Sequence, residues 1–226
     1  DAAQSIGSHY NGKKIGTFAD VTTFSFHGTK NLTTGEGGAF VTNDDEIAER
    51  AKFMREKGTD KQSFLVDNKD RGFYEYVDLG SSFVQSNLLG ALGIAQLEKL
   101  DWMNEERGRI AAFYKEGLSD LPNLEFLRLT ENAKTNWHLF GILVPPAHRY
   151  WIMDALRAEG VLSNVHYTPL HRNKYYKGMA TDEEMKGSME FFSRLLRIPI
   201  YPSLTEDQRS RIVASVRKVM SALPAE

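Results

Sequence analysis

The period of the apolar residues changes along the chain, and each period predicts one kind of element. Phe24 and Phe26 alternate with hydroxyl residues, and this period of two predicts a strand. A loop with four glycines follows, and a second apolar run begins at Ala39. The pattern therefore predicts a strand, a loop and a second strand within residues 22–42.

Apolar residues at helical spacing predict helices elsewhere in the chain. Thr205 and Gln208 match a capping box, which places the start of the last helix at residue 205. The segment of residues 88–97 is apolar over much of its circumference, as is typical of a buried helix. Together, the expected helices cover about residues 47–57, 88–97, 101–118, 148–159 and 182–195, and the segment after residue 205.

Apolar runs in the second half of the chain predict further strands, at residues 124–127, 137–144, 161–167 and 196–200. The turn residues Leu121-Pro122-Asn123 break the chain just before these runs. We therefore expect a domain boundary near residue 120. It separates an N-terminal part, residues 1–120, from a small C-terminal α/β domain, residues 121–226, whose ~100 residues are a typical domain size.

Composition narrows the class of protein. The 226 residues are 41% hydrophobic and 26% charged, with a net charge of −2, and they contain no cysteine. This balance indicates a globular protein without a nucleic-acid-binding surface, and it excludes disulfides and thiolate metal sites. No apolar run reaches the ~18 residues of a membrane helix, and the first residues do not resemble a signal peptide. We therefore expect a cytoplasmic location and no membrane partner.

Lys30 is the candidate for covalent chemistry. It lies on the short loop between the two predicted strands, among small and hydroxyl residues. A lysine held on such a loop can be desolvated, which lowers the pKa of its amine and makes the amine nucleophilic. Taken alone, the pattern favours a surface lysine, because lysine is seldom buried.

Two other readings of the motifs are disfavoured. The glycines Gly35, Gly37 and Gly38 precede a strand, whereas the dinucleotide-binding fingerprint needs a helix after its glycines. His166 and His171 lie five residues apart, without a carboxylate cluster, so we expect no metal site.

Three spaced motifs resemble the active-site signature of the nucleotide-sugar aminotransferases: Asp1-Ala2-Ala3-Gln4, Ser25-Phe26-His27-Gly28-Thr29-Lys30 and Gly35-Glu36-Gly37-Gly38. The resemblance continues through His166-Tyr167-Thr168-Pro169-Leu170-His171 and covers essentially the whole chain. It implies the aspartate-aminotransferase fold, of class α/β. Residues 1–120 would then be the C-terminal part of the large cofactor-binding domain, a mixed sheet with helices, and residues 121–226 the smaller α+β domain.

The resemblance also implies pyridoxal 5′-phosphate as cofactor and assigns roles to residues. Lys30 matches the lysine that bonds the cofactor, Asp1 the carboxylate at the ring nitrogen and Gln4 the amide near the ring. Ser25 matches the hydroxyl that holds the phosphate. Ser82 stands where many relatives have an asparagine that reaches the phosphate in the partner subunit, and its shorter hydroxyl can still donate.

His166, Tyr167 and His171 match the substrate site in this resemblance. The implied reaction moves an amino group from L-glutamate to the C4 ketone of dTDP-4-keto-6-deoxyglucose, for surface polysaccharide synthesis. The implied assembly is a homodimer, with Gly90 and Gly93 as candidates for its interface.

Alternatives remain open at this point. The scaffold also suits a C3 aminotransferase or a dehydratase acting on another nucleotide sugar, although Lys30 argues against dehydratases that carry histidine there. The family's N-terminal part is expected to lie outside these residues, so the chain resembles a fragment. We therefore expect it to bind cofactor poorly by itself, and a purely structural or interaction role is the third alternative.

Overall fold

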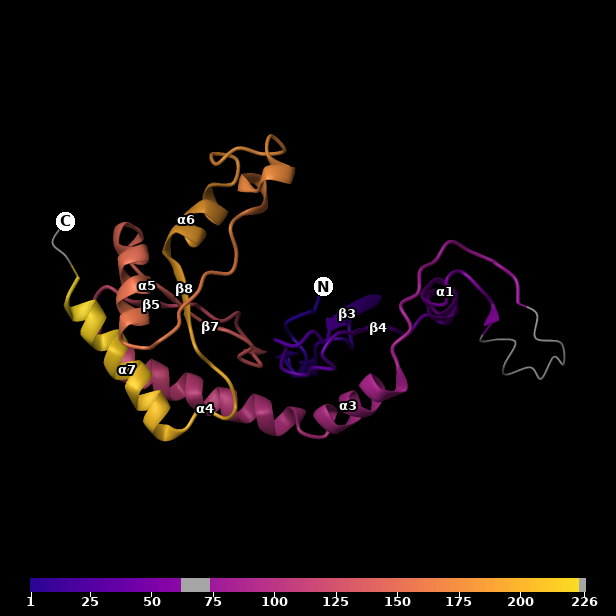
Figure 1. Cartoon of the computed structure of the whole chain (residues 1–226), viewed down its shortest axis with the longest axis horizontal. Coiled ribbons are helices and arrows are strands. Elements are labelled where there is room, and N and C mark those ends of the chain that lie inside the picture. Colours follow the sequence, from indigo (N-terminus) through magenta and orange to yellow (C-terminus); the bar gives the residue numbers. More distant parts are fainter. Residues whose placement is uncertain (62–73, 224–226) are drawn as a thin grey trace. The chain divides into compact units, whose positions relative to one another are not determined.

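The computed structural model describes residues 1–61 and 74–223, which form two compact units (Figure 1). The first unit is Asp1–Trp102 with Asn132–Asn136, and the second is Met103–Glu131 with Trp137–Glu226. This division falls inside helix α4, Leu100–Leu118, rather than at residue 120. The domain boundary drawn from the sequence stays a prediction.

A two-stranded antiparallel sheet lies at the centre of the first unit. Strand β3, Val21–Ser25, pairs with β4, Gly38–Thr42, and Ser25 lies opposite Gly38. A Cβ on Gly38 would lie 2.6 Å from the carbonyl oxygen of Phe24, so only glycine lets the strands meet at this end. The strand, loop and strand expected from the alternating pattern are confirmed.

A second small sheet brings a distant segment into the first unit. Strands β1, His9–Tyr10, and β2, Lys13–Lys14, form a hairpin around Asn11 and Gly12. These turn residues have φ of 47° and 75°, and a two-residue hairpin turn with positive φ at both positions favours an Asn-Gly pair. Strand β6, Ala133–Lys134, pairs with the other side of β1. Residues 132–136 therefore fold with the N-terminal loop.

The helices of the first unit begin at side-chain caps. The side chain of Asp44 accepts a hydrogen bond from Ile47 N at the start of α1, Asp45–Arg55. The side chain of Ser86 likewise caps α3, Asn87–Leu97. Among the described residues α3 has no buried position, and Leu88 is 82% exposed, so the prediction of a buried helix is wrong for this structure.

The hydrophobic core of the second unit packs around a three-stranded antiparallel sheet. Its strand order is β5 (Glu125–Phe126), β7 (Phe140–Leu143) and β8 (Leu195–Ile198). The turn η1 (Pro146–His148), α5 (Arg149–Ala158) and α7 (Glu206–Ser221) complete the layer beside it (Figure 1). The most completely buried core side chains come from α4, the sheet, α5 and α7, and include Ile110, Tyr114, Leu118, Phe140, Ile142, Ile152, Leu156, Leu196 and Val216.

Two expected elements differ in this unit. The strand expected at residues 161–167 is a single bridge between Asn164 and Arg197. The side chain of Asn164 accepts from Val165 N at 2.7 Å, and such local bonds compete with a strand ladder. The helix expected from residue 182 begins four residues later, as α6, Lys186–Arg194, because Asp182 pairs with side chains of the preceding loop instead of capping it.

The short 3-10 turns η2, Leu170–Arg172, and η3, Lys174–Tyr176, lie in that loop. The capping box of Thr205 and Gln208 is confirmed in both of its hydrogen bonds. Within residues 1–61 and 74–223, every helix is too short or too polar to cross a bilayer.

Gly58 tests the close packing of the first unit. It has φ of 77°, and a Cβ there would lie 1.8 Å from the carbonyl oxygen of Asp78. We expect Gly58→Ala to displace the segment that Gly58 O holds through Val77 N, raising hydrogen exchange at Val77 by about a hundredfold or more, because the clash adds to the strain of positive φ. Gly12→Ala is the matched control, because Gly12 has φ of 75° but open space around it. At the Ile15 amide, Gly12→Ala should raise hydrogen exchange only as far as left-handed backbone strain of ~1–2 kcal/mol allows, which is about 5- to 30-fold. Equal effects of the two variants would contradict the steric explanation.

Candidate active site

The first candidate residues lie at the end of strand β3. Ala2 N donates to Thr23 O at 2.9 Å, and the Asp1 carboxylate accepts from Ala3 N at 2.8 Å. These bonds place the N-terminal segment beside the strand whose last residue is Ser25. The structure therefore brings the segments of Asp1 and Ser25 together.

The loop that carries Lys30 is closed by hydrogen bonds of its own. Lys30 N donates to His27 O at 2.9 Å, and Thr34 N donates to Phe26 O at 2.9 Å. Ser25 Oγ accepts from His27 N at 3.3 Å, which leaves the hydroxyl proton of Ser25 available to a ligand. Within the described part of the chain, the half-buried Lys30 side chain has neither a hydrogen-bond partner nor an ion pair. The backbone of the loop is fixed, and the amine is left to react.

Two buried asparagines connect this loop to the N-terminal segment. Asn31, directly after Lys30, donates from Nδ2 to Asn136 O at 2.9 Å. Asn136 Nδ2 in turn donates to Gln4 O at 2.9 Å and to Ile6 O at 3.0 Å. Both asparagines are 3% exposed. Gln4 is therefore held near the lysine loop through its backbone, while its side chain is exposed.

The glycine-rich half of the loop is tightly packed. Thr34 Oγ1 donates to Glu36 O at 2.8 Å, and a Cβ on Gly37 would lie 2.6 Å from that hydroxyl oxygen. The same Cβ would lie 2.9 Å from Nε2 of Gln85, a buried donor without a hydrogen-bond partner. Glu36 takes part through its carbonyl, and its carboxylate is 83% exposed, which agrees with an anchoring role.

Ser82 contacts a different part of the first unit from the Lys30 loop. It is exposed and forms a bridge with Glu56, next to the C-terminal end of α1. No contact of its side chain with the Lys30 loop is present among the described residues. Its role toward a phosphate stays a prediction.

The side chains around the Lys30 loop match the chemical groups of pyridoxal phosphate. Lys30 offers an unpaired amine for an aldehyde, and Asp1 offers a carboxylate for a protonated ring nitrogen. Ser25 and the unpartnered amide of Gln85 offer hydrogen-bond donors, which phosphate oxygens accept. No group of three or more potential metal ligands gathers within the described ranges.

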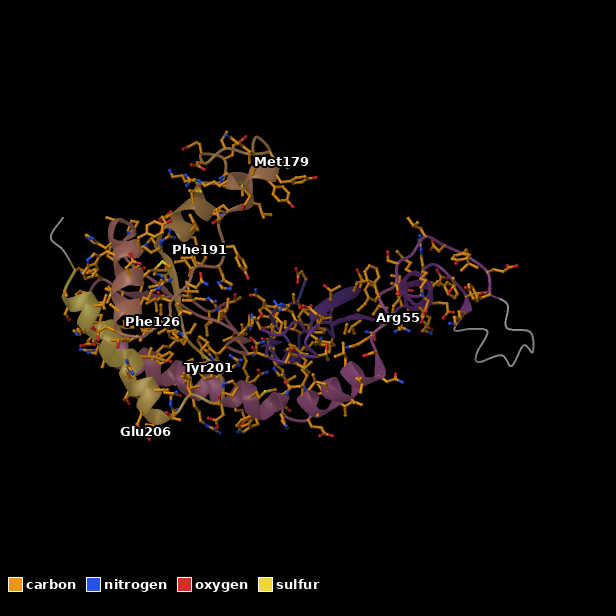
Figure 2. The ribbon with its side chains drawn as sticks, viewed as in Figure 1. Arg55, Phe126, Met179, Phe191, Tyr201 and Glu206 are labelled. Carbon is orange, nitrogen blue, oxygen red and sulfur yellow. The ribbon has the colours of Figure 1, made fainter. Side chains whose placement is uncertain are left out.

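His166, Tyr167 and His171 line a cavity of about 490 Å³ in the second unit. The rest of its wall is largely apolar and includes Met179, at the end of a loop, and Phe191 on α6 (Figure 2). The rings of His166 and Tyr167 lie 4.3 Å apart, and Tyr167 is 70% exposed. These two side chains can reach a ligand in the cavity.

His171 has a different setting from its two neighbours. Its side chain is 6% exposed, and Nε2 lies 2.9 Å from Asp182 Oδ1. Arg172 binds the same carboxylate. The guanidinium of Arg172, followed by the imidazole of His171, holds the pKa of Asp182 well below its usual range. The geometry supports a role for His171 in holding the loop; direct substrate contact stays a prediction.

Sequence reasoning missed Asn31, Asn136, Gln85 and Asp182. Asn31 could have been noticed because it adjoins Lys30. Asn136 lies 105 residues from its partner, and nothing in its local sequence marks it.

The comparisons with known proteins follow this geometry. The sequence model of the DegT/DnrJ/EryC1/StrS aminotransferase family matches residues 1–217. The chain belongs to this family. It is 30% identical, over 229 residues, to the UDP-4-amino-4,6-dideoxy-N-acetyl-beta-L-altrosamine transaminase of Helicobacter pylori, covering 100% of this chain and 59% of that protein.

Solved structures of the family agree with the fold. Helicobacter pylori PseC, an aminotransferase involved in the biosynthesis of pseudoaminic acid, matches with a TM-score of 0.90 and 30% identity, over 99% of this chain and 59% of that one. The PLP-form of the sugar aminotransferase Spr1654 from Streptococcus pneumoniae matches with a TM-score of 0.87 and 26% identity, over 98% and 57%. The expected family and α/β fold class are confirmed, and the chain spans about 59% of the length of the curated relatives.

The Asn136 amide should be needed for the first unit. Asn136→Ala leaves the carbonyl oxygens of Gln4 and Ile6 without this donor, and an unsatisfied buried group costs about 1–3 kcal/mol. We expect hydrogen exchange to report a fall of this size in the free energy of unfolding of the first unit. Asn43→Ala is the control, because Asn43 is exposed before α1, and it should change little. Equal behaviour of the two variants would argue against the bridging role.

Acid should open the loop that His171 and Asp182 close. Because the folded pKa of Asp182 is depressed, its contribution is complete above the unfolded pKa of about 3.9 and is lost as the pH falls through the folded value. Protection of the Tyr176 amide should therefore fall below about pH 4. Asp182→Asn should remove this pH dependence, whereas Asp154→Asn on α5 should keep it. Persistence of the dependence in Asp182→Asn would assign it to another group.

Proposed function

We propose that the protein containing this chain is a pyridoxal-phosphate-dependent aminotransferase acting on a nucleotide-activated keto sugar, with L-glutamate as amino donor. Family membership over residues 1–217 supports the reaction class. The observation that carries the proposal is the Lys30 amine, which has no partner among the described residues and stands on a loop whose backbone is hydrogen-bonded on both sides.

The residues of the first unit have distinct tasks. Pyridoxal phosphate supplies an aldehyde and an electron-accepting ring when bound. Lys30 Nζ would hold the cofactor through its aldehyde and would move a proton at the reacting carbon of the substrate, for which the amine has to lie within hydrogen-bond reach. The Asp1 carboxylate holds a proton on the ring nitrogen. Ser25 Oγ donates to a phosphate oxygen, and Gln85 Nε2 is a second donor of this kind.

The second unit handles the sugar nucleotide in this proposal. Tyr167 and His166 present their rings to the cavity, where an apolar wall suits the 6-deoxy face of a sugar. His171, held by Asp182, keeps this wall in place.

The acceptor is proposed more narrowly as a 4-keto-6-deoxy sugar. The sequence resemblance favours dTDP-4-keto-6-deoxyglucose, aminated at C4. The transaminases of Helicobacter pylori and Campylobacter jejuni, at 30–32% identity, have names that refer to UDP-linked sugars, and they favour a UDP-linked acceptor as the second candidate. Soluble expression as a cytoplasmic homodimer is part of the same proposal.

The test of this function uses the full-length protein that contains these residues. With pyridoxal phosphate and borohydride, we expect the label on the peptide of Lys30, and no label there in Lys30→Arg, which keeps the charge but cannot be trapped in this way. Glutamate-dependent amination of dTDP- and UDP-linked 4-keto-6-deoxy sugars then identifies the acceptor, and Lys30→Arg should lose about 10³-fold or more of the rate. Label on a different lysine, or no amination of either sugar, would refute the proposal.

A further inference from the structure

A second cavity in the C-terminal unit carries an unpaired cation. Its volume is about 540 Å³, and it lies where β8 leads into α7, beside Tyr201 (Figure 2). Arg197 and Arg211 line it together with His138, and its wall contains no aspartate or glutamate among the described residues. The cavity is therefore positively charged in its lining.

Arg197 differs from Arg211 in having no partner. Arg211 donates to Glu159 O at 3.0 Å, while the Glu159 carboxylate is taken by Lys218 at 2.7 Å. The guanidinium of Arg197 makes no hydrogen bond and no ion pair with the described residues, and its Nε is buried. Burial lowers the pKa of Arg197. A half-buried guanidinium without a counter-charge is unfavourable unless a ligand supplies one.

The backbone fixes the position of this guanidinium. Arg197 N donates to Asn164 O at 2.8 Å, and Asn164 N donates back to Arg197 O at 3.2 Å. On its other side Arg197 pairs with Gly141 of β7. A residue held in the middle of three paired segments presents its side chain from a rigid base, which reduces the entropy lost when a ligand binds.

Two neighbouring carbonyls already accept hydrogen bonds from core side chains. Tyr114 Oη donates to Pro199 O at 2.9 Å, and Arg107 donates to Ile200 O at 2.7 Å. Both carbonyls are thus satisfied from the core side. The wall then offers mainly donors and positive charge, which an anionic ligand requires and a cationic ligand does not tolerate.

We propose that Arg197 and this cavity bind an oxyanion group of a substrate. This inference rests on the proposed function, because two groups in that reaction have the required chemistry: the carboxylate of the amino donor and the diphosphate of the sugar nucleotide. The planar guanidinium fork matches either group with two parallel hydrogen bonds. Arg197 is a binding residue here and takes no part in bond breaking.

The direct test measures anion binding by the 226-residue chain. The backbone amide signal of residue 197, which every variant retains, is followed by NMR during titration with L-glutamate and, separately, with inorganic diphosphate. We expect one probe to shift this signal, and Arg197→Gln to weaken its binding by about tenfold or more. The affinity of Arg197→Lys should lie between those of the unmodified chain and Arg197→Gln, because lysine keeps the charge but lacks the planar guanidinium fork. Arg157→Gln, an exposed position on α5 outside the cavity, is the matched control and should bind like the unmodified chain.

The kinetic test in the full-length protein separates the two sources. A rise in KM for L-glutamate alone in Arg197→Gln assigns the cavity to the donor carboxylate, and a rise for the sugar nucleotide alone assigns it to the diphosphate. Absence of binding by both probes, or equal binding by Arg197→Gln and Arg157→Gln, would overturn the inference. Arg197-dependent binding in a protein without aminotransferase activity would refute the proposed function and leave the anion site standing.

Discussion

The candidate cofactor site depends on one hydrogen-bonded bridge, from Asn31 through Asn136 to the carbonyls of Gln4 and Ile6. Lys30 and Asp1 lie on separate loops, and loops by themselves do not hold two reacting groups at a fixed distance. Buried amides can do so, because each unmade hydrogen bond would leave a desolvated polar group. The bridge also explains why residues 132–136 fold with the first unit although the chain on both sides belongs to the second.

The exposed face of α3 shows how burial depends on what surrounds a helix. Its composition is that of a core helix, yet Leu88, Ile94 and Leu97 are 82%, 65% and 59% exposed. An amphipathic or apolar pattern states that a face requires a partner, and it does not identify the partner.

Local signals were sufficient for part of the fold. The box of Thr205 and Gln208 was predicted because its two residues lie three positions apart, and β3 was predicted because Phe24 and Phe26 alternate with hydroxyl residues. The segment after Val161 was misjudged, since its apolar content suits a strand but only Asn164 finds a pairing partner. In the site, the motif of Lys30 was recognisable by its resemblance to the family signature. Asn136 acts across 105 residues, and Asp182 pairs with residues 10 and 11 positions away, so neither has a local signature.

Lys30 in the first unit and Arg197 in the second can be compared with the more deeply buried arginines of the fold. Arg107 and Arg149 are more deeply buried than Arg197, and each donates through one terminal nitrogen to a backbone carbonyl, although the Nε of each has no hydrogen-bond partner. Lys30 and Arg197 are half-buried and have no such partner in the described structure. Lys30 and Arg197 therefore lack even the carbonyl acceptor that Arg107 and Arg149 have, which leaves their charged groups available to a ligand. In the two proposals, Lys30 takes an aldehyde, and Arg197, in a wall without aspartate or glutamate among the described residues, takes an anion.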